Sequence, residues 1–283
     1  GQASATVALT PIDDSEDEVN EIESTTPTIT TTLAANQYLT GTASGVINIT
    51  DNDVAGVTFP AVAGFTNESD GNFVERIFTV RLSSRPTAPV TLTFASSNPG
   101  EAAVDTNTSA GNQNQTSITF TTSNWNIART VHVLGQQDTF DDGDITYSIQ
   151  TTSVTSADAK YNGLGVSDQS WTNFDDDTAN IIISSISGPV TEAGGVATFT
   201  IRLTSEPYDR VDFTLSSNDI SEYQLQSGSE VATLDSSNWS SGVTIAVVGV
   251  DDSIDDDNVA FNVQIAKSVS NDPAYDSRGG WDE

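Results

Sequence analysis

Residues 131–144 read VHVLGQQDTFDDGD, in which a short run of strand-forming residues leads into a loop with four aspartates. The same arrangement recurs at 7–20 as VALTPIDDSEDEVN and at 245–258 as IAVVGVDDSIDDDN. In all three copies an aspartate follows the apolar run, and a pair of acidic residues begins three positions later. Repetition at a fixed spacing indicates tandem copies of one structural unit.

The second and third copies also match outside this loop. The sequence FTVRL at 78–82 corresponds to FTIRL at 199–203, and Tyr161 corresponds to Tyr275. We therefore predict three units: the C-terminal part of a repeat at 1–54, a complete repeat at 55–178, and a repeat lacking its last strand at 179–283.

Alternation of apolar and polar residues predicts the secondary structure. Val90, Leu92 and Phe94 alternate with threonines, a pattern typical of half-buried antiparallel strands. In the complete repeat we predict seven strands, at about 57–65, 73–82, 89–96, 116–120, 129–135, 143–150 and 167–174. Seven strands in about 100 residues are typical of an immunoglobulin-like sandwich. The predicted fold class is therefore all-β, with tandem immunoglobulin-like antiparallel β-sandwiches.

Strand parity places the acidic segments of the complete repeat at one tip. When successive strands run antiparallel, the loops after the first, third and fifth strands and the exit of the seventh lie at the same end. These segments carry the following acidic residues: Glu68, Glu101, Asp105, Asp138, Asp141, Asp142, Asp144, Asp175, Asp176 and Asp177.

Such a concentration of carboxylates needs a counter-charge. Two like charges about 4 Å apart repel by roughly 1 to 4 kcal/mol at dielectrics between water and a protein surface. Calcium takes six to eight oxygen ligands and prefers carboxylates, whereas magnesium keeps bound water and zinc prefers histidine or cysteine. The alternative is a solvated acidic loop that only confers solubility, which repetition at fixed spacing disfavours.

The acidic loops at 138–144 and 252–257, with the closing segments at 51–53 and 175–177, resemble the Calx-β domain of sodium–calcium exchangers and bacterial surface proteins. In that family a glutamate after the first strand, the acidic loop after the fifth and a terminal acidic triplet bind calcium. The resemblance implies Ca²⁺ as the cofactor and the following ligands: Glu68, Asp138, Asp141, Asp142, Asp144, Asp175, Asp176, Asp177, Glu192, Asp252, Asp255, Asp256, Asp257, Asp14, Asp17, Asp51 and Asp53. Only residues 55–178 contain every ligand group, so we expect a complete site there.

The composition restricts the partners. A net charge of −31 arises from 40 acidic and 9 basic residues, which excludes nucleic acid and disfavours an anionic membrane surface. No apolar run approaches the ~18 residues of a membrane span. There is no cysteine, so the fold has no disulfides.

For the tryptophans and the single histidine, a role in binding or catalysis is an alternative to a structural role. Trp125 and Trp239 correspond between repeats, and this repetition favours core anchors over a carbohydrate platform. The single histidine, His132, aligns with Ala8 and Ala246 on the predicted outward face of a strand. A Ser–His–Asp arrangement would need this histidine, and paired carboxylates that recur in every copy are unlike a single glycosidase site. We therefore expect no enzyme.

These observations favour a structural or adhesive array of repeats in a secreted or cell-surface protein. In this array calcium rigidifies the tips of the repeats, and neighbouring repeats contact one another. The alternative is a subunit of a filament or surface layer that binds copies of the same chain. In that arrangement residues 1–54 of one copy would add a strand to the unpaired strand expected at 257–265 of the next, head to tail, and would bring Asp51 and Asp53 to its tip.

Overall fold

The computed structural model describes the chain at residues 10, 12–17, 22–25, 47–59, 64–68, 76–107, 115–251, 253–254, 257–278 and 281–282. Within these residues every regular element is a β-strand, so the all-β prediction is confirmed. No helix long and apolar enough to cross a membrane occurs in this part of the chain. The chain divides into two compact units. The first contains Gly1–Thr66, Phe73–Gln136 and Thr146–Asn173, and the second contains Asn67–Asn72, Gln137–Ile145 and Phe174–Glu283.

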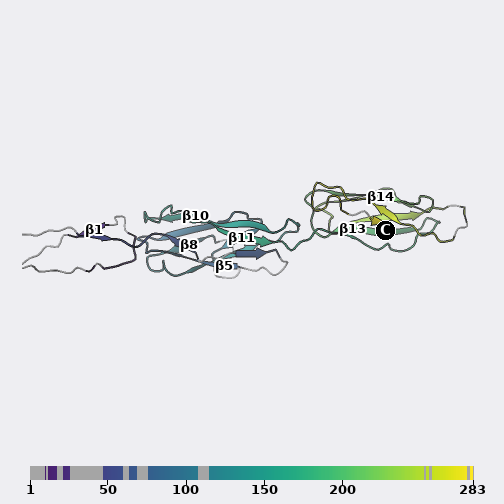
Figure 1. The fold of residues 1–283 in the computed structure, drawn as a ribbon. Helices are drawn as coiled ribbons and strands as arrows, with labels where there is room; N and C mark the ends of the chain where they lie inside the picture. Colours follow the sequence, from purple (N-terminus) through teal and green to yellow (C-terminus); the bar gives the residue numbers. More distant parts are fainter. Residues whose placement is uncertain are drawn as a thin grey trace, which may run out of the picture. The chain divides into compact units, whose positions relative to one another are not determined.

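The first unit contains a β-sandwich of two sheets (Figure 1). One sheet has the order β4-β11-β10-β6-β8, with the bounds Gly64–Asn67, Gln169–Phe174, Ile145–Ser156, Val90–Ser96 and Ser117–Phe120. The other has the order β3-β5-β9-β7, with the bounds Val57–Thr58, Arg76–Leu82, Arg129–Gly135 and Ala102–Asp105. A separate pair, β1 (Ile22–Thr25) and β2 (Ile47–Thr50), corresponds by the repeat to β10 and β11.

The core of this sandwich follows the alternation in the sequence. Phe78, Val80 and Leu82 of β5 are buried, and they belong to the same core as the buried Leu92 and Phe94 of β6. Burying one such side chain contributes about 1.5 to 3 kcal/mol. The two sheets therefore pack face to face through residues that the period-two pattern identifies.

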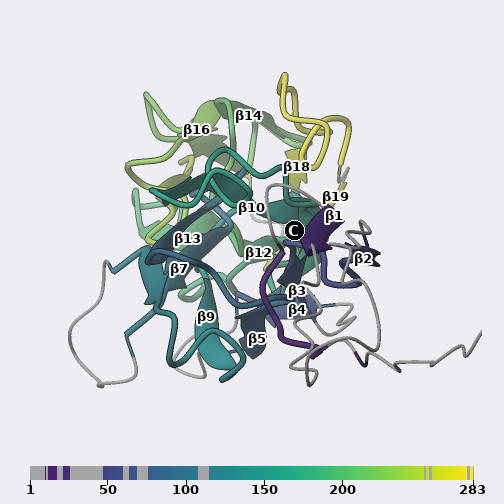
Figure 2. The same cartoon turned by 90° about the vertical axis from the view of Figure 1, so that its left-hand side faces the viewer.

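The second unit repeats this plan with its own core. One sheet has the order β12-β13-β17-β15, with the bounds Ile181–Ile183, Val196–Leu203, Val243–Gly249 and Tyr223–Leu225. The other, drawn in green to yellow in Figure 2, has the order β16-β14-β18-β19, with the bounds Val231–Leu234, Val211–Ser217, Val263–Ile265 and Trp281–Asp282. Strand for strand this order matches the first sandwich, except that residues 188–191, which correspond to β4, form no strand.

The repeated aromatic residues hold equivalent parts of the backbone in both sandwiches. The buried hydroxyl of Tyr161 accepts a hydrogen bond from Ser84 N at 3.1 Å and donates to Ser84 O at 2.7 Å. Tyr275 makes the same contacts to Ser205, at 3.1 and 2.8 Å. The tryptophans at 125 and 239 each pack against one core, which supports their interpretation as core anchors.

The prediction of a single strand at 57–65 is wrong, because the chain forms two short strands there. β3 pairs with β5 in one sheet, whereas β4 lies beside β11 in the other. Glycine is required at position 64, since a Cβ there would lie only 2.1 Å from the ring of Trp171. The backbone of β4 therefore passes directly against the largest side chain of the core.

Two further strand predictions need correction. Residues 102–105 form β7, although this short segment between the predicted tip residues Glu101 and Asp105 was expected to be a loop. In the second unit, the strand predicted at 257–265 begins only at Val263, and it pairs with β19 through Gln264↔Asp282 and Ile265↔Trp281. The edge that we expected to lack a partner therefore has one at these residues.

Candidate metal centre

Acidic segments from three parts of the chain lie together in the second unit. Glu68 follows β4, residues 138–144 connect β9 to β10, and residues 175–177 follow β11. The backbone N–H of Glu68 donates to the carbonyl oxygen of Phe174 at 3.0 Å. This contact places Glu68 directly beside the acidic segment that begins at Asp175.

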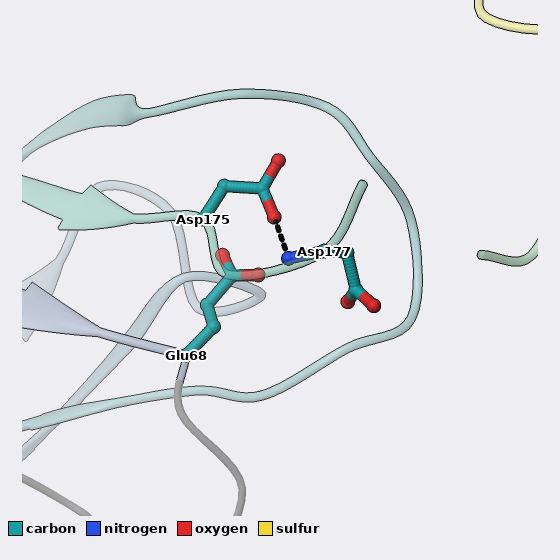
Figure 3. A group of neighbouring side chains, drawn as sticks. All are labelled: Glu68, Asp175 and Asp177. Carbon is teal, nitrogen blue, oxygen red and sulfur yellow. Dashed lines mark hydrogen bonds between the residues drawn. The ribbon is translucent and has the colours of Figure 1, made fainter. Parts of the chain in front are cut away.

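Three of these carboxylates form a compact cluster. One oxygen from each of Glu68, Asp175 and Asp177 lies within 4.8 Å of the other two. Glu68 is only 1% exposed, while Asp175 and Asp177 are half-buried. Figure 3 shows the three side chains, with Glu68 reaching from one strand end toward the segment that carries the two aspartates. These three residues therefore lie together, as strand parity predicts.

Backbone amides orient Asp175 within the cluster. Its Oδ1 accepts a hydrogen bond from Asp177 N at 2.7 Å, and its Oδ2 accepts one from Gly143 N at 2.8 Å. Its own N–H donates to Asp144 Oδ1 at 3.3 Å. Gly143 has a φ of 77°, a left-handed conformation that glycine adopts without strain. The acidic loop and the terminal segment thus fix each other's conformation.

The donor set fits a hard divalent cation. At 4.8 Å two carboxylates repel by about 0.9 kcal/mol in water and by about 3.5 kcal/mol at an effective dielectric of about 20. A cation between them offsets these repulsions with attractions. The cluster contains only carboxylate oxygens, which suit calcium, whereas zinc prefers nitrogen and sulfur ligands.

Other predicted ligands of the middle repeat make different contacts. Asp141 Oδ2 accepts a hydrogen bond from Ala179 N at 2.7 Å, and Asp142 Oδ2 accepts one from the hydroxyl of Tyr208 at 3.2 Å. Asp138 is half-buried, and its Oδ1 accepts a hydrogen bond from Phe140 N at 2.9 Å. One of its carboxylate oxygens also lies within 4.8 Å of one of Glu68. Asp144, which holds Asp175 N, and Asp176 are both exposed.

The acidic residues of 1–54, which belong to the first unit, repeat the same local geometry. Asp53 N donates to Asp51 Oδ1 at 2.9 Å, as Asp177 does to Asp175. Asp17 Oδ2 accepts a hydrogen bond from Ala55 N at 2.7 Å, as Asp141 does from the residue 38 positions later. Asp14 Oδ1 accepts one from Glu16 N at 2.8 Å. The acidic residues that correspond in the two copies therefore also make equivalent hydrogen bonds.

The surroundings of Asp17 and Asp53 shift their pKa values in opposite directions. Burial raises the pKa of Asp53, and the carboxylates of Asp51, Asp13, Asp14 and Asp17 raise it further. For Asp17, burial acts to raise the pKa, but the hydrogen bond from Lys160, the Ala55 amide and the charge of Lys160 together outweigh it and lower the pKa. Lys160 Nζ lies 2.8 Å from Asp17 Oδ1. Asp17 therefore has a cationic partner within the protein.

Two predicted ligands of the third copy lie within the described residues, Glu192 and Asp257. Glu192 is exposed, and it lines a pocket together with Glu222, Asp257 and Phe261. Asp257 has a φ of 64° and corresponds to Gly143, so both copies make a left-handed turn at this position. The other predicted ligands of this copy lie outside the described residues: Asp252, Asp255 and Asp256.

Sequence reasoning missed a buried polar network in the first unit. Thr66 Oγ1 is 3.0 Å from the hydroxyl of Tyr147 and donates to Asn173 Oδ1 at 2.8 Å, and Asn173 Nδ2 donates to Glu101 Oε2 at 3.1 Å. Burial raises the pKa of Tyr147, and the charge of Glu101 adds to this effect. Alternation gives no signal for such a network, because polar residues here occupy inward positions.

Asp105, which strand parity placed at the tip, lies along the sheet instead. Asp105 is paired with His132 across β7 and β9, three positions from the Ala102↔Gly135 pair that begins this register. His132 is half-buried between the buried Val131 and Val133, so it lies on the outward face of β9, as predicted.

A scan against family models and a search of curated proteins found no match. Solved structures with some similarity include the calcium binding domain CBD12 of CALX1.1, with 14% identity over 75% of this chain and 79% of that chain, at a TM-score of 0.30. Domains 4–9 of the surface layer protein SbsC have 14% identity over 87% of this chain and 33% of that chain, at a TM-score of 0.26. Domains 5–6 of the same S-layer protein have 15% identity over 81% and 96%, at a TM-score of 0.22. At these TM-scores the likeness carries no argument about function. The function is therefore inferred from the chain's own residues.

Proposed function

We propose that Glu68, Asp175 and Asp177 bind a calcium ion, and that the chain is a calcium-binding structural array of an extracellular or cell-surface protein. The observation that carries this proposal is the cluster of three carboxylates within 4.8 Å, one of them almost fully buried. Bound calcium would supply positive charge and would connect the end of β4 to the segment after β11.

The chain's own residues prepare the cluster for an ion. Backbone amides of Gly143 and Asp177 hold both oxygens of Asp175, so part of the ordering cost is met before binding. Extracellular calcium modules commonly bind at about 10⁻⁴ to 10⁻³ M, an affinity that a partly hydrated site with few protein ligands can reach. The proposal assigns no catalytic step to these carboxylates.

A structural role agrees with the contacts of the acidic loop. Thr139 O accepts a hydrogen bond from Glu206 N at 2.6 Å, and Asp141 holds the backbone of Ala179. Both contacts reach residues that belong, by the sequence repeat, to the following copy. Calcium that orders residues 138–144 would therefore stiffen the connection between neighbouring repeats.

Calorimetric titration with calcium, after dialysis against a chelator, tests this proposal. The matched pair Asp175→Asn and Asp176→Asn changes neighbouring residues of the same type, but only Asp175 lies in the cluster. We expect saturable binding to the wild type, a large loss for Asp175→Asn and a small one for Asp176→Asn. No binding at millimolar calcium, or equal losses for the two variants, would contradict the assignment.

A further inference from the structure

The acidic loop makes a second set of contacts in the second unit, with residues 206–208. The ring of Phe140 stacks on that of Tyr208, with centroids 4.4 Å apart and an interplanar angle of 9°. Thr139 contributes two hydrogen bonds, since its carbonyl accepts from Glu206 N and its Oγ1 donates to Glu206 Oε2 at 2.8 Å. The loop is therefore held from the side of residues 206–208 as well as by Asp175.

Tyr208 is anchored at its backbone but exposed at its side chain. Its N–H donates to Oδ2 of the buried Asp272 at 2.8 Å, whereas the residue as a whole is 59% exposed. The hydroxyl donates to Asp142 Oδ2 at 3.2 Å. Partial burial of the phenol and the nearby Asp142 carboxylate raise the pKa of Tyr208 to about 12. The phenol thus keeps its proton at neutral pH and remains a hydrogen-bond donor.

A short path of two hydrogen bonds and one peptide link joins this hydroxyl to the carboxylate cluster. Asp142, which Tyr208 contacts, immediately precedes Gly143, whose N–H holds Asp175 Oδ2. The next residue, Asp144, accepts the N–H of Asp175. Three consecutive residues therefore connect the phenol to a member of the cluster, and a shift of Asp142 would change the support of Asp175.

We propose that Tyr208 is a positioning residue for the calcium site, acting through Asp142 and the two residues that follow it. This inference rests on the proposed function. By holding Asp142 before the ion arrives, Tyr208 reduces the conformational freedom that binding has to remove. Linkage requires the reverse effect as well, so calcium strengthens the contact between the acidic loop and Tyr208 by the same factor.

The first unit offers an internal contrast. Ser15 O accepts a hydrogen bond from Arg85 N at 2.6 Å, which repeats the backbone contact of Thr139 with Glu206. Here the side-chain contact is an ion pair, Arg85 Nη1 to Glu16 Oε1 at 2.7 Å, and the position of Tyr208 is taken by Thr87. The backbone contact thus recurs, whereas the phenol is particular to the second unit.

Calcium titration of the full chain with Tyr208→Phe tests this inference. The substitution keeps the ring and removes only the hydroxyl. We expect the dissociation constant to rise about fivefold, the effect of losing one hydrogen bond at a partly solvated position. Because the side chain is largely exposed, the melting temperature without calcium should stay unchanged. The control Thr87→Ala, at the corresponding position of the first unit, should leave calcium binding as in the wild type.

A second comparison separates positioning from a general structural role. In an Asp142→Ala background, which has no side-chain acceptor at this position, Tyr208→Phe should cause little further loss of affinity, because the two changes remove one interaction. A shift of melting temperature with calcium up to tens of millimolar can follow even weak binding in this background. An unchanged dissociation constant for Tyr208→Phe, or an equal loss in both backgrounds, would overturn the inference while the calcium site itself stands. Absence of calcium binding by the wild type would instead refute the proposed function.

Discussion

The substitution Glu68→Gln should change stability in opposite directions with and without calcium. Without the ion, it removes the repulsions of Glu68 with Asp175 and with Asp177, each about 0.9 kcal/mol at 4.8 Å in water. Because Asp175 and Asp177 are only half-buried, we take this screened value and expect a gain of about 2 kcal/mol. A gain of this size corresponds to a rise in melting temperature of about 5 °C or more for the affected sandwich.

With calcium the sign reverses. The wild type gains about 2.7 kcal/mol when calcium is present at 100 times its dissociation constant. A glutamine amide is a weaker calcium ligand than a carboxylate and carries no charge, so the Glu68→Gln variant should lose most of this gain. The wild type should then melt at or above the temperature of the variant, whereas in chelator it melts below it.

Thermal unfolding of wild type and variant, each in chelator and in excess calcium, measures all four values. Glu230→Gln provides a control, because this exposed glutamate undergoes the same loss of charge outside the cluster. The control should show the same calcium-dependent shift as the wild type. A change of the same sign for Glu68→Gln in both conditions would refute the idea that these carboxylates form an ion site.

Three further predictions concern the fold. Trp171→Ala should destabilise the first unit by about 3 to 5 kcal/mol, because it empties the position of a side chain that is only 2% exposed; chemical denaturation would measure this loss. Tyr161→Phe and Tyr275→Phe should each cost about 1 to 3 kcal/mol, since each leaves a buried backbone amide and carbonyl without the hydroxyl; similar unfolding midpoints to the wild type would contradict the role of these tyrosines. Asp17 has a lowered pKa, so its contribution to stability is present above the unfolded-state pKa of about 3.9 and is lost as the pH falls through the lower folded-state value. The stability difference between wild type and Asp17→Asn, measured in chelator, should accordingly shrink below about pH 4, and a constant difference would argue against the ion pair with Lys160.

Much of the fold could be predicted because most strands carry a clean period of two. β5, β6, β9 and their counterparts in the second unit bury alternate residues, as the sequence indicates. β7 was missed because Ala102–Asp105 has only four residues, follows Glu101 and ends at Asp105. Periodicity also gives no signal for the close contact of β4 with Trp171 at Gly64, because Trp171 lies far away in the sequence.

The candidate site could be predicted as a region but not as a set of contacts. The repeat aligned Asp17 with Asp141, yet only the folded chain shows that both accept a hydrogen bond from a backbone amide 38 residues later. By sequence all three residues at 175–177 are equivalent candidates, whereas the structure brings the first and third together with Glu68. Such distinctions arise from side-chain direction in loops, which periodicity does not determine.

The calcium site can be tested directly by a crystal structure of the chain grown with calcium, with anomalous diffraction data to locate the ion. We expect an anomalous peak bound by carboxylate oxygens of Glu68, Asp175 and Asp177, at the roughly 2.3 to 2.6 Å distances that calcium takes in proteins. A well-ordered cluster without such a peak at millimolar calcium, or an ion bound by other residues only, would contradict the assignment.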